Sequence, residues 1–127
     1  MKGLAATVEV LAAALDPVRV RAGVARQEDP LPFVVVVQDD ADRRQVGNLV
    51  DATVGVRVVA ETPGAAASLF SAVRLAFDRL RGVQLTSGIA LRGAFLQSES
   101  TQYFPPDEGE SVGWHGVDST WKVWFLE

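Results

Sequence analysis

The residues of this chain that could carry out chemistry are few. His115 is the single histidine, and Ser111 and Ser119 lie near it, so the one triad within reach is a serine activated by this histidine. His115 stands between Trp114 and Gly116, and no nucleophile-elbow pattern occurs anywhere in the chain. We therefore interpret His115 as a histidine of a surface loop.

Two acidic runs are the candidates for a metal site or for acid–base chemistry. They comprise Asp39, Asp40 and Asp42 in the first run and Asp107, Glu108 and Glu110 in the second. The first run continues into Arg43 and Arg44, where a calcium loop would need a turn glycine and a distal bidentate carboxylate. Nothing in the sequence positions a carboxylate pair for proton transfer. We read both runs as solvated loops and expect no metal, no cofactor and no catalytic residue.

Composition excludes several further classes of function. The 127 residues, expected to form a single domain over 1–127, include no cysteine, which excludes disulfides and thiolate chemistry. The net charge of −4 argues against general binding of nucleic acid or anionic membranes. No segment reaches the roughly 18 apolar residues that a membrane span requires. Glycine-rich phosphate-binding patterns are also absent from the sequence.

The element that organises the chain is a strand that runs directly into a helix. Between Val50 and Ala60 apolar residues alternate with polar ones, which predicts a half-buried strand. From Pro63 to Leu80 the apolar spacing changes to that of one helix face. Thr62 suits the N-cap and Pro63 the first helical position, while Gly82 is the expected C-cap.

The remaining segments complete an α+β pattern. We expect a helix over 3–15, strands over 18–22, 33–38, 89–99 and 117–126, a turn or edge segment over 83–88, and polar loops over 39–48 and 102–116. Most consecutive strands are joined by loops and not by helical crossovers. The fold class predicted is therefore α+β, with a mainly antiparallel sheet of about four to five strands and two helices packed on it.

Two strands are more apolar than a sheet with one solvated face requires. They are the runs 33–37 and 121–126, the second with Trp121 and Phe125 on one face and Trp124 on the other. Two interpretations remain open. The second face of the sheet is an interface with another copy or another protein, or one helix covers each face.

Several stretches of the sequence resemble one protein family. They are Leu31–Val37, Val54–Ala60, Glu61–Ala67, Phe95–Glu99 and Val117–Trp124. This succession of elements and short words, which spans residues 4–126, is similar to the tail-terminator or tail-completion proteins of long-tailed bacteriophages and prophages. The segment around Arg19 and Arg21 departs from the common pattern of that family.

The resemblance implies a structural virion protein and not an enzyme. Such proteins form a ring, usually a hexamer, at the head-proximal end of the tail tube, where they end tube polymerisation and join the tail to the head connector protein. The expected partners are thus further copies of the chain, the tail tube protein and the connector, with DNA only passing through the lumen and no membrane involved. The expected location is the tail or neck of the virion, and the host cytoplasm during assembly.

The contacts that we expect on this reading lie mainly in the two polar loops. The candidate interface residues are Asp39, Asp40, Arg43, Arg44, Asp107, Glu108 and Trp124. A head–tail connector or other neck protein is the alternative within the same class. An alternative from a different class is a small α+β ligand-binding or enzymatic domain that uses His115.

Overall fold

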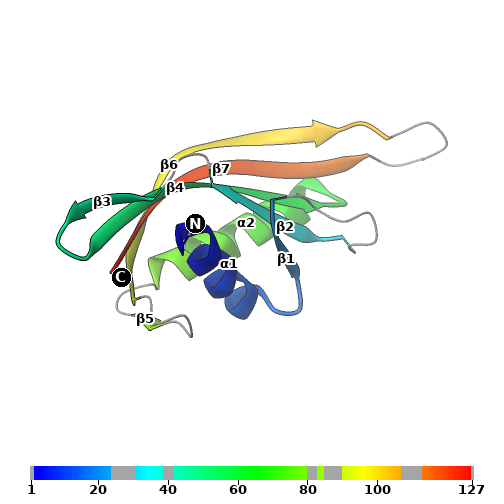
Figure 1. The fold of residues 1–127 in the computed structure, drawn as a ribbon. Helices are drawn as coiled ribbons and strands as arrows, with labels where there is room; N and C mark the ends of the chain where they lie inside the picture. Colours follow the sequence, from blue (N-terminus) through cyan, green and yellow to red (C-terminus); the bar gives the residue numbers. More distant parts are fainter. Residues whose placement is uncertain are drawn as a thin grey trace.

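The computed structural model describes residues 2–23, 31–38, 42–79, 83–84, 90–106 and 113–126 (Figure 1). The elements in chain order are α1 (Lys2–Leu15), β1 (Arg19–Ala22), β2 (Phe33–Gln38), β3 (Arg43–Val46), β4 (Leu49–Ala60), α2 (Pro63–Asp78), β5 (Val83–Gln84), β6 (Ala90–Phe104) and β7 (Trp114–Leu126). Neither helix in these ranges is long and apolar enough to cross a membrane.

The strands form one sheet in the order β1-β2-β4-β7-β6-β5, and β3 pairs with β4 outside this path. β1 and β2 are parallel, and every other pairing is antiparallel. The expected α+β class and mainly antiparallel sheet are confirmed. Seven strands pair within the described residues, more than the four to five expected, because two short strands, β3 and β5, join the sheet beside the longer ones.

The strand that leads into a helix is present as expected. Thr62 is the N-cap of α2, and its Oγ1 accepts a hydrogen bond from the backbone N of Ala65 at 3.1 Å. The end of the helix differs from the expectation. α2 stops at Asp78, and the backbone N–H of Arg79 at the C-cap bonds the carbonyl oxygen of Leu75. The expected C-cap, Gly82, lies outside the described residues.

Both helices pack on the same face of the sheet, which Figure 1 shows as the lower face. Leu11 of α1 and Phe77 of α2 enter one core with Val54, Trp121 and Phe125 of the sheet, and each is at most 2% exposed. α1 also contacts α2 directly. The alternative in which one helix covers each face is therefore wrong, because the apolar stripes of both helices meet the same set of alternating strand residues.

Both expected polar loops contain paired strand. Residues 43–46 form β3, which pairs with the start of β4, so the expected loop over 39–48 is in part a hairpin. In the second segment β6 continues to Phe104 and β7 begins at Trp114, with Gln102 opposite Gly116. Residues 43–46 and 101–103 are exposed and so give no burial pattern of period two, while Pro105, Pro106 and the acidic residues that follow favour a loop. Residues 39–41 and 107–112 lie outside the described residues.

Candidate interaction surface

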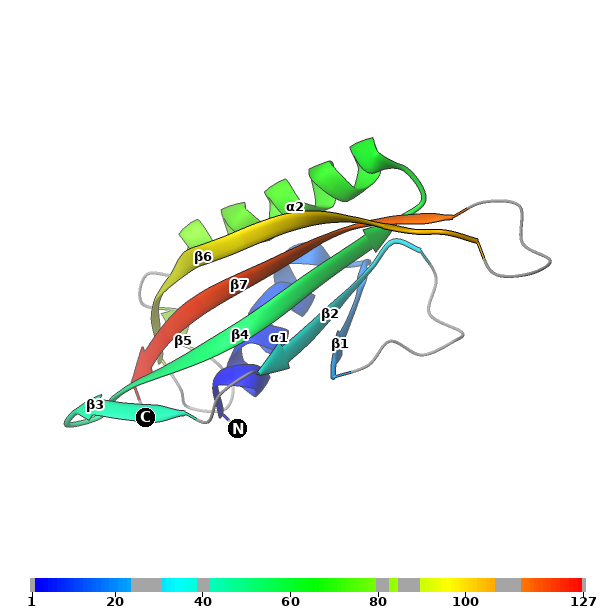
Figure 2. The same cartoon turned by 90° about the horizontal axis from the view of Figure 1, so that it is seen from above.

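The face of the sheet that points away from the helices is the candidate functional surface, and we call it the open face (Figure 2). Strand register fixes its side chains, because directly opposed residues share a face. It carries Phe33, Val35 and Val37 of β2, Thr53, Gly55, Arg57 and Val59 of β4, Trp114, Asp118, Thr120, Lys122 and Trp124 of β7, and Phe95, Ser98, Ser100, Gln102 and Phe104 of β6. Among the described residues, no helix lies over this face.

A pocket of about 600 Å³ lies on the open face where β2, β4 and the ends of the β6–β7 hairpin meet, and we call it the open-face pocket. Its apolar lining comes from Phe33, Val35, Val37, Val59, Phe104 and Trp114. The rings of Phe33 and Trp114 meet edge to face, with centroids 6.3 Å apart, an arrangement that aromatic pairs favour. Trp114 is still 40% exposed and Val37 38%, so apolar surface remains for a partner.

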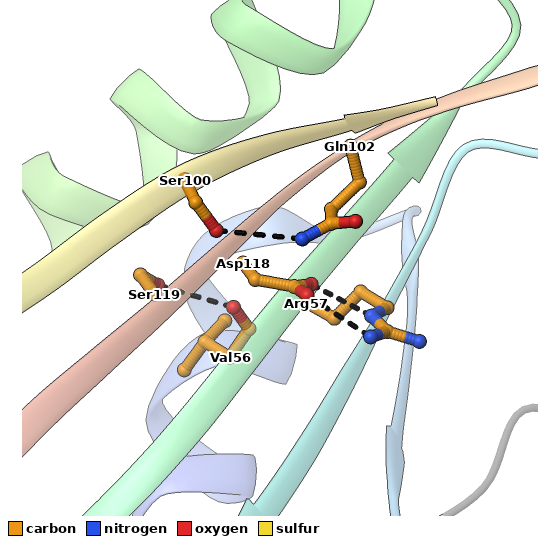
Figure 3. Close-up of polar contacts among 6 residues, drawn as sticks. All are labelled: Val56, Arg57, Ser100, Gln102, Asp118 and Ser119. Carbon is orange, nitrogen blue, oxygen red and sulfur yellow. Dashed lines mark hydrogen bonds and ion pairs between the residues drawn. The ribbon is translucent and has the colours of Figure 1, made fainter. Parts of the chain in front are cut away.

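One ion pair lies inside this apolar lining. Arg57 Nε and Nη2 donate to the two carboxylate oxygens of Asp118 at 2.7 and 2.9 Å (Figure 3). The guanidinium also lies 5.3 Å from the centre of the Phe104 ring, within cation–π range. The hydrogen bond to Asp118 raises the pKa of Arg57; burial lowers it, and the charge of Asp118 raises it further. The pair thus presents almost no net charge to a partner.

The raised pKa of Arg57 affects the stability of the fold only at high pH. A group with a raised folded-state pKa stabilises the fold below its unfolded-state pKa and stops doing so as the pH rises through the folded-state value. For an arginine that window lies far above neutrality, so Arg57 adds no pH dependence to folding near pH 7.

The Arg57–Asp118 pair is expected to contribute little to folding. Its side chains are 49% and 29% exposed, so water and salt weaken their attraction. A double-mutant cycle with Arg57→Gln and Asp118→Asn should give a coupling free energy of about 0.2–1 kcal/mol, measured by urea unfolding and falling with added salt. A coupling above about 2 kcal/mol that salt does not change would contradict this exposed geometry.

Between Phe95 and Phe104, the open face of β6 carries polar, neutral side chains. Ser100 lies opposite Asp118, and Gln102 Nε2 is 3.5 Å from Ser100 Oγ (Figure 3). Figure 3 also shows Ser119 bonded to Val56. Its hydroxyl donates to the carbonyl oxygen of Val56 at 3.1 Å and belongs to the buried, helix-covered face. The open face therefore combines an apolar pocket with neutral hydrogen-bonding groups beside it.

The structure separates the predicted interface residues into three groups. Arg43 is opposite Asp51, which is opposite Trp124, so Arg43 and Trp124 share the open face two strands apart. Arg44 is opposite Val50 and belongs to the other face of the hairpin. The remaining candidates lie outside the described residues, and they are Asp39, Asp40, Asp107 and Glu108.

A buried carboxylate attaches β3 to β4. Asp51 is 3% exposed, and its Oδ2 accepts a short hydrogen bond from Nε2 of Gln45. Its Oδ1 has no hydrogen-bond partner among the described residues. Arg44 Nη1 donates to the carbonyl oxygen of Gly47 at 2.8 Å, and Gly47 has a positive φ of 56° that favours glycine. These contacts fix the shape of the β3–β4 hairpin.

His115 lies in β7 and not in a loop, which corrects the expectation. It is half-buried, and its ring is 4.9 Å from the ring of Tyr103 on β6. Ser119 Oγ donates to Val56 and accepts from Trp121, and Ser111 lies outside the described residues. Across the described residues no group of three or more His, Cys, Asp or Glu side chains could hold a metal ion.

Sequence reasoning missed four residues of the open-face pocket, namely Arg57, Phe104, Trp114 and Asp118. Arg57 and Asp118 are far apart in the chain and meet only through the register of β4 with β7. Phe104 and Trp114 fell in a segment expected to be a loop. One signal for these residues was present in the sequence. Between Val117 and Phe125 the odd-numbered residues form the buried face of the strand, so Asp118 belongs to the other face. Continuing the same alternation back along the chain places Trp114 on that face as well.

Comparison with known proteins gives a likeness of fold. No protein-family model matches the sequence, and no curated protein matches it. Among solved structures, a chain of "Virion of native gene transfer agent (GTA) particle" is similar, with a TM-score of 0.54 and 19% sequence identity. The likeness covers 99% of this chain and 93% of that chain. This chain therefore shares its fold, over nearly its whole length, with a chain of a virion-like particle.

Proposed function

We propose that this chain is a structural protein of a phage-type particle, and that it acts as a tail terminator without catalysing a reaction. The observation that carries the proposal is the fold shared with a chain of the gene transfer agent particle over 99% of one chain and 93% of the other. The open face adds support, since it leaves Val37 and Trp114 more than a third exposed in a pocket that suits a protein partner.

In this role copies of the chain form a ring, of six subunits as in the family that the sequence resembles, at the head-proximal end of the tail tube. One rim of the ring matches the last tube layer and the other rim does not, so tube polymerisation ends there. The second rim then binds the head connector, and DNA passes through the lumen. Arg43, Arg44 and Trp124 are the described residues proposed for these contacts, and Asp39, Asp40, Asp107 and Glu108 are the proposed contacts outside them.

A polymerisation experiment tests the proposal. The tube protein of the same particle is polymerised with and without the purified chain, and tube lengths are measured by electron microscopy. We expect the chain to bind one end of each tube and to shorten the tubes as its concentration rises. Tubes of unchanged length at a saturating concentration of the chain would contradict a terminator. Binding to the isolated connector without binding to tubes would instead indicate the neck-protein alternative.

The enzymatic or ligand-binding alternative is tested by His115→Ala. A structural ring does not depend on a proton-transfer group, so tube capping should be unchanged in this variant. His115 contacts the Tyr103 ring, so circular dichroism should confirm that the variant folds. Loss of capping by a folded His115→Ala protein would indicate that the function depends on the histidine.

A further inference from the structure

We propose that the β3–β4 hairpin of one copy docks, through Val46, into the open-face pocket of the next copy. The inference rests on the proposed ring and assigns its subunit contact. The hairpin is an exposed projection at one end of the molecule (Figures 1 and 2). All four residues of β3 are exposed, and among the described strands β3 pairs with β4 alone. Val46 is 79% exposed, more than any other large hydrophobic residue of the described chain.

Hydrogen bonds within the same copy hold the hairpin. Gln45 is bonded to the buried Asp51, and Arg44 is bonded to the carbonyl oxygen of Gly47 at the turn. A segment that is already ordered loses little conformational entropy on docking, so its apolar contact contributes more of its free energy to binding. Val46 is thus presented on a hairpin that is hydrogen-bonded within its own copy.

The pocket supplies the complementary surface. Its apolar walls include Phe33, Val35 and Val37 on the β2 side and Phe104 and Trp114 on the other side. A volume of about 600 Å³ exceeds what one valine side chain occupies, so the hairpin turn can enter together with Val46. The Arg57–Asp118 pair keeps this site nearly neutral, which suits an apolar side chain better than an unpaired charge would.

A copy cannot fill its own pocket with its own hairpin. β4 runs from the hairpin at Leu49 to the pocket residues Gly55 and Val59, which places Gly55 about 20 Å and Val59 about 33 Å along the strand. The register of β3 on β4 holds the hairpin at the far end. The contact must therefore join two copies through two different surfaces, and such head-to-tail contacts close into rings when the rotation permits.

Disulfide trapping tests the contact directly, because the natural chain has no cysteine. The variant Val46→Cys/Val37→Cys places one thiol on the hairpin and one in the pocket. Mild oxidation should yield a ladder of covalent oligomers that ends at the size of the ring and returns to monomer on reduction. A disulfide needs Cα atoms about 4.4–6.8 Å apart, so the ladder requires true docking. Mixing the two single variants should give dimers that contain one of each.

The matched control uses Leu75, which is 49% exposed on α2 on the opposite side of the molecule. Val46→Cys/Leu75→Cys should form no ladder. A complementary pair of variants avoids cysteine: Val46→Asp should weaken self-association at least about tenfold by native mass spectrometry, and Leu75→Glu should not. Circular dichroism should show that all variants remain folded.

The outcomes separate this contact from the proposed function. A Val46–Val37 ladder supports the contact. Rings that assemble at the tube end without that ladder overturn the contact, leave the terminator role standing, and assign the pocket to another partner such as the tube protein. Covalent dimers of Val46→Cys alone, with no ladder in the double variant, overturn it in favour of a symmetric contact. If the natural chain neither self-associates nor binds tubes, both proposals are overturned.

Discussion

Replacing Trp121 by alanine is expected to lower the free energy of unfolding by about 3–5 kcal/mol. Trp121 is 2% exposed, and its ring centroid lies 4.3 Å from that of Phe77 on α2. Its indole Nε1 donates to Ser119 Oγ at 2.9 Å, and Ser119 in turn donates to Val56. Alanine therefore leaves a cavity between sheet and helix and removes a buried hydrogen bond, in a domain whose total stability is about 5–15 kcal/mol.

Trp124→Ala is the matched control, because Trp124 lies on the open face and is only half-buried. In urea titrations monitored by circular dichroism, Trp124→Ala should lower the free energy of unfolding by much less than Trp121→Ala does. Trp121→Phe removes the Nε1 donor as well as part of the ring. It should therefore lower the free energy of unfolding by about 1 kcal/mol more than the smaller ring alone would. Equal losses for Trp121→Ala and Trp124→Ala would contradict the assignment of the two faces.

Leu11→Ala should lower the free energy of unfolding by about 2–5 kcal/mol. Leu11 is 0% exposed and belongs to the core that α1 shares with α2 and the sheet. The variant therefore tests whether the N-terminal helix is docked on the same face as α2. The measurement is chemical unfolding, with the midpoint and slope compared with those of the natural chain.

Leu75→Ala provides the comparison for Leu11→Ala, since it makes the same chemical change at a position 49% exposed on α2. Its effect should be well below that of Leu11→Ala, about 1 kcal/mol or less. A fall in the free energy of unfolding of less than about 1 kcal/mol for Leu11→Ala would show that α1 is not packed in the core. The face of the sheet that α2 covers would then be covered only in part.

The long elements were predictable because each has a periodic buried side. The alternation from Val50 to Ala60 and the capping residues Thr62 and Pro63 specify strand and helix locally. The short strand β3 was not predictable, since all four of its residues are exposed and its pattern carries no burial signal. The same reason applies to the far end of β6, where residues 100–103, beyond the strand expected over 89–99, are all exposed.

The packing of the helices could not be derived from the sequence. An amphipathic pattern shows that a helix has an apolar face, but it does not show which side of the sheet that face covers. The apolar run in β2 was correctly identified as having surplus hydrophobic surface, yet two explanations fitted it equally. Placement of α1 and α2 on one side leaves Val35 and Val37 on the other, and the proposed interface rests on this observation.

The candidate surface was predicted only in part. Arg43 and Trp124 share the open face, although they are far apart in the sequence, because β3, β4 and β7 bring them into one row. The ion pair of Arg57 with Asp118 depends on a register between strands that are 61 residues apart in sequence, and a single sequence does not contain that register.

Native mass spectrometry tests the proposal that copies of this chain assemble into a ring on a tail tube. The purified protein is measured alone and then with assembled tail tubes. We expect a closed ring, either in solution or on one tube end, because an open pocket and an exposed hairpin occur on every copy. Six subunits is the number that the family resemblance implies. A monomer under both conditions, with no mass bound to the tubes, would contradict the proposed ring.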